Sequence, residues 1–161
     1  MFVVDDFEPW RRFACSALSR EPELEFVGEV SDGLAAIQKA QELQPDLILL
    51  DIGLPSLNGI PAGRRIREVS PKSKILFVSE NRAEDTVMET FRTGGRGYVV
   101  KSDAGSELLP AIRAVLRGEL FASACLGLSN EDLARVKIRA KATDTEYSAL
   151  YSLIPKELIR S

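Results

Sequence analysis

Four short apolar runs end in polar residues, and this pattern constrains the fold more than any other feature of the chain. The runs cover residues 2–4, 47–50, 75–78 and 98–100, and the polar residues that follow them are Asp5-Asp6, Asp51, Ser79 and Lys101. An unbroken apolar run is typical of a strand buried on both faces, as in a parallel sheet. Ligands of open parallel sheets bind beyond the carboxyl ends of the strands. The pattern therefore predicts that these polar residues meet in one crevice.

Helical segments alternate with the strands along the first three-quarters of the chain. The predicted strands are 2–4, 24–30, 47–50, 74–78 and 97–100, and the predicted helices are 9–19, 33–43, 60–69, 83–93 and 104–117. Strict alternation favours a doubly wound five-stranded parallel sheet with helices on both faces. Right-handed crossovers favour the flavodoxin-like strand order 2-1-3-4-5. Apolar spacing also places Phe13 and Leu34 on the inner stripes of the first two helices.

The alternation stops near residue 118, so the sequence predicts one domain over 1–118 and a partly helical C-terminal extension over 119–161. Ser129, with an acidic residue three positions later, is typical of a helix start. Residues 135–141 alternate with a period of two, which favours a strand instead. We expect a helix here, and a second short helix over 145–153.

Composition excludes several classes of protein. The chain has 161 residues, 45% of them hydrophobic, and a formal net charge of −3, which argues against a protein built mainly to hold nucleic acid. It contains no histidine, which excludes a Ser-His-Asp triad, a histidine-ligated zinc site and a phosphohistidine carrier. No apolar run reaches membrane-spanning length, so we expect a cytoplasmic protein that does not contact the membrane. Cys15 and Cys125 are expected to be reduced and buried.

The residue types at the predicted crevice suit phosphoryl transfer. Three carboxylates (Asp5, Asp6 and Asp51) repel one another, and a divalent cation such as Mg²⁺ relieves the repulsion. Asp51 follows a central strand, and a carboxylate there can act as a nucleophile towards phosphorus. Lys101 would neutralise the phosphoryl group, and Ser79 would donate a hydrogen bond to it. An Asp-Asp pair after a strand is most often an ordinary polar turn, and a lone lysine in a loop is most often a solvated charge. Asp51 is a better candidate because it ends a central strand. The order of all these residues at successive strand ends carries the prediction.

The same positions carry a family resemblance. The matching pieces are Val-Val-Asp-Asp at 3–6, Leu-Leu-Asp-Ile-Gly-Leu-Pro at 49–55, Asn-Gly at 58–59, Val-Ser at 78–79 and Gly-Gly-Arg-Gly-Tyr-Val-Val-Lys-Ser at 94–102. Over about residues 2–118 the chain resembles the receiver domain of bacterial two-component response regulators, most of all the NarL/FixJ-like subfamily. The resemblance implies a phosphoacceptor with intrinsic autophosphorylation and autodephosphorylation chemistry, rather than a multiple-turnover enzyme.

The resemblance also implies roles and partners. Asp51 would accept phosphate from a sensor histidine kinase, and Asp5, Asp6, Asp51 and the backbone carbonyl of Gly53 would hold Mg²⁺. Ser79 and Lys101 would grip the phosphoryl group. Tyr98 would turn inward when Ser79 moves, which would switch the face formed by the helices 83–93 and 104–117 and the strand between them.

Two residues depart from the pattern of the family. Many receivers have proline after the site lysine, joined by a cis peptide; Ser102 stands there in this chain, and a cis bond before serine costs more. Glu80 follows Ser79 where a small residue is common. We expect its side chain to crowd an incoming phosphodonor and to slow phosphorylation by small donors.

The output of the chain is left open by the sequence. NarL/FixJ-like regulators carry a helix-turn-helix domain, and 119–161 holds too few residues for a linker and all of that domain. The 129–161 segment has five acidic and six basic residues, so its charge does not predict direct DNA binding. The chain could regulate a protein partner, pair with a second copy, or be a truncated DNA-binding regulator. It could also be a receiver-like binding module that is never phosphorylated, or a flavodoxin-like cofactor binder.

Overall fold

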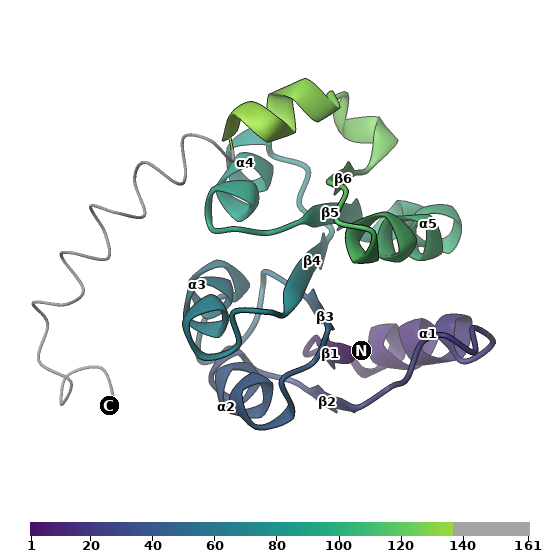
Figure 1. Ribbon diagram of the computed structural model, residues 1–161, viewed down its shortest axis with the longest axis vertical. Coiled ribbons are helices and arrows are strands. Elements are labelled where there is room, and N and C mark those ends of the chain that lie inside the picture. The colour runs from purple at the N-terminus through teal and green to yellow at the C-terminus, as the bar shows by residue number, and fades with distance from the viewer. Residues whose placement is uncertain (137–161) are drawn as a thin grey trace, which may run out of the picture.

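A parallel sheet forms the centre of the molecule. The computed structural model describes residues 1–136, and its six strands lie in the order β2-β1-β3-β4-β5-β6 (Figure 1). The strands are β1 (Phe2–Val4), β2 (Gly28–Val30), β3 (Leu47–Leu50), β4 (Lys74–Ser79), β5 (Gly97–Val100) and β6 (Phe121–Ala122). Neighbouring strands all run parallel. The predicted doubly wound α/β fold and the order of the first five strands are confirmed.

Helices cover both faces of this sheet. They are α1 (Glu8–Leu18), α2 (Gly33–Leu43), α3 (Gly59–Val69), α4 (Glu84–Arg92) and α5 (Ala104–Leu116), with short 3₁₀ helices η1 (Lys101–Asp103) and η2 (Ala124–Leu126). In Figure 1, α1 and α5 lie on one side of the strands and α2, α3 and α4 on the other. The apolar side chains divide in the same way into two clusters, because residues that alternate along each strand point to opposite faces.

The number of strands differs from the prediction. A sixth strand, β6, extends the sheet beside β5, in the range that the sequence assigns to the extension. It consists of only two residues, Phe121 and Ala122, both partly buried, and is shorter than the strands that a sequence pattern usually reveals. The five-strand prediction is therefore wrong by this one short edge strand.

Several predicted faces and bounds also need correction. Phe13 is 41% exposed and Leu34 is 57% exposed, so neither lies in the core, contrary to the prediction. The core stripe of α1 is narrower and consists of Trp10, Ala14 and Leu18. β2 contains only residues 28–30 of the predicted 24–30. Both cysteines were expected to be buried, yet Cys15 is half-buried and Cys125 is exposed on η2.

The C-terminal extension packs on the α2–α4 side. Residues 130–136 are helical, and Ser129 and Asp132 form the reciprocal backbone hydrogen bonds of a capping box. Leu133 and Val136 are buried in the same apolar cluster as residues of α4 and β5. The helix predicted here is confirmed as far as residue 136; the alternating pattern from 137 onward and the helix expected over 145–153 lie outside the described residues. Among residues 1–136, no helix is long and apolar enough to cross a membrane.

Ser123 ties the extension to the end of β5. Its backbone N–H donates to the Tyr98 carbonyl (2.9 Å), and its hydroxyl accepts a hydrogen bond from the Val100 N–H (2.8 Å). The Ser123 side chain is buried, so water cannot replace it as acceptor. The chain just before Lys101 is thereby held by a residue of the extension.

We expect Ser123→Ala to lower the free energy of unfolding by about 1–3 kcal/mol, because it leaves the buried Val100 N–H without this acceptor. Urea unfolding of the variant measures the loss. Ser106→Ala is the matched control, since the Ser106 hydroxyl makes an exposed bond to the Asp103 carbonyl and should contribute far less. Equal stability of the two variants would contradict the role given to Ser123.

Candidate metal and phosphoacceptor site

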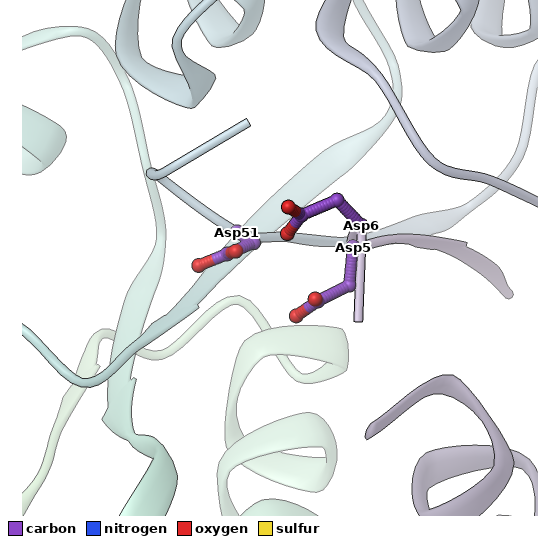
Figure 2. Close-up of side chains that lie close together, drawn as sticks. All are labelled: Asp5, Asp6 and Asp51. Atoms are coloured by element: carbon purple, nitrogen blue, oxygen red, sulfur yellow. The ribbon is translucent and has the colours of Figure 1, made fainter. Parts of the chain in front are cut away.

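Two neighbouring strands bring the three predicted carboxylates together. Asp5 and Asp6 follow β1, Asp51 follows β3, and the last residues of these strands, Val4 and Leu50, are paired in register. The pairing continues beyond the strands, because the Asp51 N–H donates to the Val4 carbonyl at 3.0 Å. Figure 2 shows Asp5 and Asp6 leaving one segment of chain and Asp51 the next, with their carboxylates close together.

The cluster has the donor set of a divalent cation site. One carboxylate oxygen from each of Asp5, Asp6 and Asp51 lies within 4.8 Å of the other two. Asp5 is fully buried and Asp51 nearly so, whereas Asp6 is exposed to solvent. Mg²⁺ binds through a few carboxylates and keeps several water molecules, so a cluster with one open side fits it. The three predicted metal-binding carboxylates are thus brought together.

Lys101 lies inside this acidic crevice. Its Nζ is 2.6 Å from Asp5 Oδ2 and 3.6 Å from Asp51 Oδ2, and its side chain is only 13% exposed. Asp5 Oδ1 accepts a hydrogen bond from the Phe7 N–H at 2.9 Å, which fixes the orientation of that carboxylate. The Lys101 ammonium therefore offsets part of the negative charge of the cluster.

Asp51 has the electrostatic environment of a carboxylate that is costly to ionise. Burial raises the pKa of Asp51, and the neighbouring Asp5 and Asp6 carboxylates raise it further. Lys101 and the Ile52 N–H, which donates to Asp51 Oδ1 at 2.8 Å, lower the pKa but leave a net increase. Added positive charge from a divalent cation would favour the ionised, nucleophilic form.

This environment predicts that Asp51→Asn stabilises the metal-free protein at neutral pH. Because the pKa of Asp51 is higher in the folded protein than in the unfolded chain, ionising Asp51 favours unfolding. The cost is absent below the ordinary aspartate pKa of 3.8 and grows as pH rises through the folded pKa. Urea unfolding in the presence of a chelator should therefore show the variant more stable at neutral pH, with the difference shrinking as the pH falls. A difference that stays constant or widens on acidification would contradict this account.

The loop after Asp51 is packed tightly at its two ends and open in its middle. A Cβ on Gly59 would overlap the Asp51 carbonyl oxygen and lie 2.8 Å from Ile52 Cα, and the Gly59 N–H donates to the Ile52 carbonyl at 2.7 Å. A Cβ on Gly33, at the start of α2, would likewise overlap the Leu57 carbonyl oxygen. Gly53 is exposed, and a Cβ there would meet nothing within 4 Å, so this residue lies in the open part of the loop.

Ser79 and Tyr98 meet through a residue that the sequence did not single out. The Ser79 hydroxyl accepts a hydrogen bond from the Asn81 N–H at 3.2 Å, and the Tyr98 hydroxyl donates to the Asn81 carbonyl at 2.6 Å. Tyr98 is fully buried, and burial raises the pKa of its hydroxyl, while a hydrogen bond with Ser79 acts in the opposite direction. Asn81 thus joins the predicted switch pair, and its place two residues after Ser79 is the only sequence signal for it.

The two departures from the family pattern lie at the rim of the crevice. Glu80 is exposed directly after β4. Ser102 is also exposed, and its hydroxyl accepts a hydrogen bond from the Arg82 guanidinium at 2.7 Å. Residues 1–136 contain no cis peptide bond, in agreement with the presence of serine rather than proline after Lys101.

The fold and this site define a response regulator receiver. Residues 1–113 match the family of response regulator receiver domains, and the chain belongs to that family. It is 31% identical over 157 residues to the nitrate/nitrite response regulator protein NarL of Escherichia coli (strain K12), a match that covers 98% of this chain and 70% of NarL. It is 34% identical over 119 residues to the response regulator protein VraR of Staphylococcus aureus (strain NCTC 8325 / PS 47), covering 74% of this chain and 57% of VraR.

Solved structures give the same result for the fold. A two-component response regulator of the LuxR family from Aurantimonas sp. SI85-9A1 is similar with a TM-score of 0.71 and 28% identity, over 88% of this chain and 96% of that one. The signal receiver domain of the putative response regulator NarL from Mycobacterium tuberculosis is similar with a TM-score of 0.69 and 26% identity, over 73% of this chain and 95% of that one. The resemblance inferred from the sequence is confirmed.

Proposed function

We propose that the protein is a phosphorylation-dependent switch that accepts a phosphoryl group on Asp51 in a Mg²⁺-dependent reaction. The single observation that carries this proposal is the position of Asp51, nearly buried beside two further carboxylates and 3.6 Å from the Lys101 ammonium. A structural salt bridge needs only one carboxylate for one lysine. The excess of negative charge in a partly closed crevice calls for a cation from solution.

The proposed reaction is a displacement at phosphorus. A carboxylate oxygen of Asp51 forms a bond to phosphorus while the P–N bond of a phosphohistidine breaks. The electron pair of the broken bond stays with the ring nitrogen, and the donor, protonated at its other nitrogen, leaves as neutral imidazole. Because this chain contains no histidine, the donor residue must belong to another protein. A sensor histidine kinase is the donor that the family membership supports.

The residues around Asp51 have separate tasks in this proposal. Asp5, Asp6, Asp51 and the Gly53 carbonyl would hold Mg²⁺, which neutralises charge on the phosphoryl oxygens when bound. Lys101 would turn from Asp5 towards the phosphoryl group, a short movement because it already lies between Asp5 and Asp51. The Ser79 hydroxyl would give up the hydrogen bond that it accepts from the Asn81 N–H and would donate a hydrogen bond to a phosphoryl oxygen.

The turn at Asn81 and strand β5 connect the site to the C-terminal extension. Moving Ser79 disturbs the turn that also accepts the Tyr98 hydroxyl, and Tyr98 lies in the strand held by Ser123 of the extension. The helix of residues 130–136 packs in the apolar cluster shared by α4 and β5. We therefore propose that phosphorylation changes how residues 119–136 pack on the 1–118 domain, and that a downstream protein partner or a second copy of the chain responds.

Intact mass measurement tests the phosphoacceptor role. The protein is incubated with Mg²⁺ and acetyl phosphate or phosphoramidate, beside an Asp51→Ala variant and a sample containing EDTA. We expect a phosphate-sized mass gain that is absent in both controls. Glu80→Ala should accelerate the reaction if the exposed Glu80 side chain crowds the donor.

Competing functions predict different results. A receiver-like binding module would gain no mass with either donor, in the wild type or in Glu80→Ala. A cofactor binder of similar fold would be purified with a coloured ligand and would not depend on Mg²⁺. A mass gain that persists in Asp51→Ala would show that another residue accepts the phosphoryl group and would contradict the proposal.

A further inference from the structure

The indole of Trp10 lies beneath the ammonium group of Lys101. Lys101 Nζ is 5.4 Å from the centroid of the Trp10 ring. Trp10 is only 9% exposed, so the indole is largely shielded from water. A lysine within about 6 Å of a tryptophan face is attracted by the ring quadrupole, and the attraction grows as the pair is desolvated.

Trp10 is itself held rigidly relative to the acidic cluster. It lies in the first turn of α1 and packs with Ala14 and Leu18 in the core on this side of the sheet. The next residue, Arg11, donates a hydrogen bond from its guanidinium to the Asp5 carbonyl at 2.7 Å. The start of α1, which carries Trp10, is thus tied to the strand end that carries Asp5.

Lys101, in contrast, has a flexible side chain and two carboxylates within reach. Four methylene groups let the ammonium move between Asp5, where it is now paired at 2.6 Å, and Asp51 at 3.6 Å. Asp5 is also one of the three carboxylates proposed to hold the metal. The ammonium group and a divalent cation therefore compete for Asp5, and any contact that holds Lys101 there opposes metal binding.

We propose that Trp10 is a positioning residue that holds the Lys101 ammonium against Asp5 in the metal-free protein and so raises the Mg²⁺ concentration at which the site fills. The inference rests on the proposed metal site and goes beyond it. It assigns to α1 a part in setting the response of the site to the cation. Binding of the cation releases Lys101 from the indole and from Asp5, which frees it for Asp51.

The fluorescence of the intact protein tests this directly, because Trp10 is the only tryptophan in the chain. Titration with Mg²⁺ should change the Trp10 emission as the ammonium leaves the ring, with the same midpoint as binding measured by calorimetry. In Lys101→Met, Mg²⁺ should still bind but the emission should stay nearly constant. The same metal-induced emission change in wild type and Lys101→Met would overturn the proposal.

A double-mutant cycle supplies a second test. Trp10→Leu should tighten Mg²⁺ binding in calorimetry by about two- to fivefold, the scale of one lost cation–π contact, and Trp10→Phe should have a smaller effect. In the Lys101→Met background neither substitution should change the affinity. Phe13→Leu is the matched control, because Phe13 touches the Trp10 ring at a centroid distance of 5.2 Å and is itself exposed. Thermal unfolding with and without metal confirms that each variant is folded.

The outcomes separate this inference from the proposed function. A wild-type protein that binds no Mg²⁺ overturns both. A protein that binds Mg²⁺ and becomes phosphorylated, but whose affinity is the same in Trp10→Leu, retains the proposed function and loses the role of Trp10. If Trp10→Leu changed the Mg²⁺ affinity equally in the wild-type and Lys101→Met backgrounds, Trp10 would act through packing alone and not through Lys101.

Discussion

Replacing Gly59 by alanine should destabilise the protein by about 3 kcal/mol, the upper range for overpacking a well-packed site, and should impair the acidic site at the same time. The added Cβ would overlap the backbone carbonyl of Asp51 and crowd Ile52 Cα. Both obstacles are main-chain atoms, so no rotation of a side chain relieves the clash. The start of α3 and the segment that carries Asp51 must shift relative to each other, which disturbs the position of Asp51 in the acidic cluster. Urea unfolding and Mg²⁺ calorimetry measure the two effects.

Gly53→Ala is the matched control in the same loop. A Cβ on Gly53 meets nothing within 4 Å, and the backbone of Gly53 is not in the left-handed region, so alanine fits. We expect the stability of this variant to lie within about 0.5 kcal/mol of wild type, as for other exposed substitutions. If Gly59→Ala were as stable as Gly53→Ala, the close approach between Gly59 and the acceptor segment would be refuted.

Replacing Asp5 by asparagine should weaken Mg²⁺ binding by roughly ten- to a hundredfold, equivalent to about 1.4–2.8 kcal/mol. The substitution keeps the shape of the side chain and removes the negative charge of the most buried carboxylate in the cluster. It also releases Lys101, whose remaining partner at the site is Asp51. Calorimetric titration of the purified variant gives the affinity directly.

Glu80→Gln provides the comparison for the loss of a negative charge near the crevice. Glu80 is exposed and lies outside the cluster of three carboxylates, so its replacement should change the affinity by less than about threefold, as expected for a screened surface charge. Wild-type affinity in Asp5→Asn would show that the metal does not use this cluster. An equal loss of Mg²⁺ affinity in both variants would show that only the total negative charge matters and that Asp5 is not a ligand.

The centre of the fold could be predicted because its strands are buried on both faces. β1, β3 and β5 are buried along their whole length and appear in the sequence as unbroken apolar runs. Parallel strands in such a sheet end at a common edge, so the polar residues after them could be placed together without knowing any distance. This geometry brought Asp5, Asp51 and Lys101 within ion-pair range in the structure.

The edges of the fold could not be predicted in the same way. Apolar spacing on a helix shows which residues share a stripe, but the width of the stripe that is covered depends on the neighbouring elements. Phe13 and Leu34 lie at the margins of their stripes and remain exposed. β6 has two residues and no pattern of its own; its pairing with β5 and the buried Ser123 hydroxyl place it.

The contacts that tune the site were also beyond the sequence. Trp10 and Lys101 are far apart in the chain, and nothing in the spacing of residues indicates that an indole from the first turn of α1 reaches the ammonium. Asn81 likewise joins Ser79 and Tyr98 through its backbone, which carries no residue-specific signal. Strand-end chemistry is readable from residue types, whereas these contacts depend on how the helices and turns pack.

Chemical trapping of the phosphorylated residue tests the central claim most directly. The protein is treated with acetyl phosphate and Mg²⁺ and then with borohydride, which reduces an acyl phosphate to an alcohol and so converts a phosphorylated aspartate to homoserine. Peptide mass spectrometry should find homoserine at position 51 and unchanged aspartate at positions 5 and 6. Homoserine at either of those positions, or a phosphate-bearing peptide that lacks residue 51, would contradict the assignment of Asp51 as the phosphoacceptor.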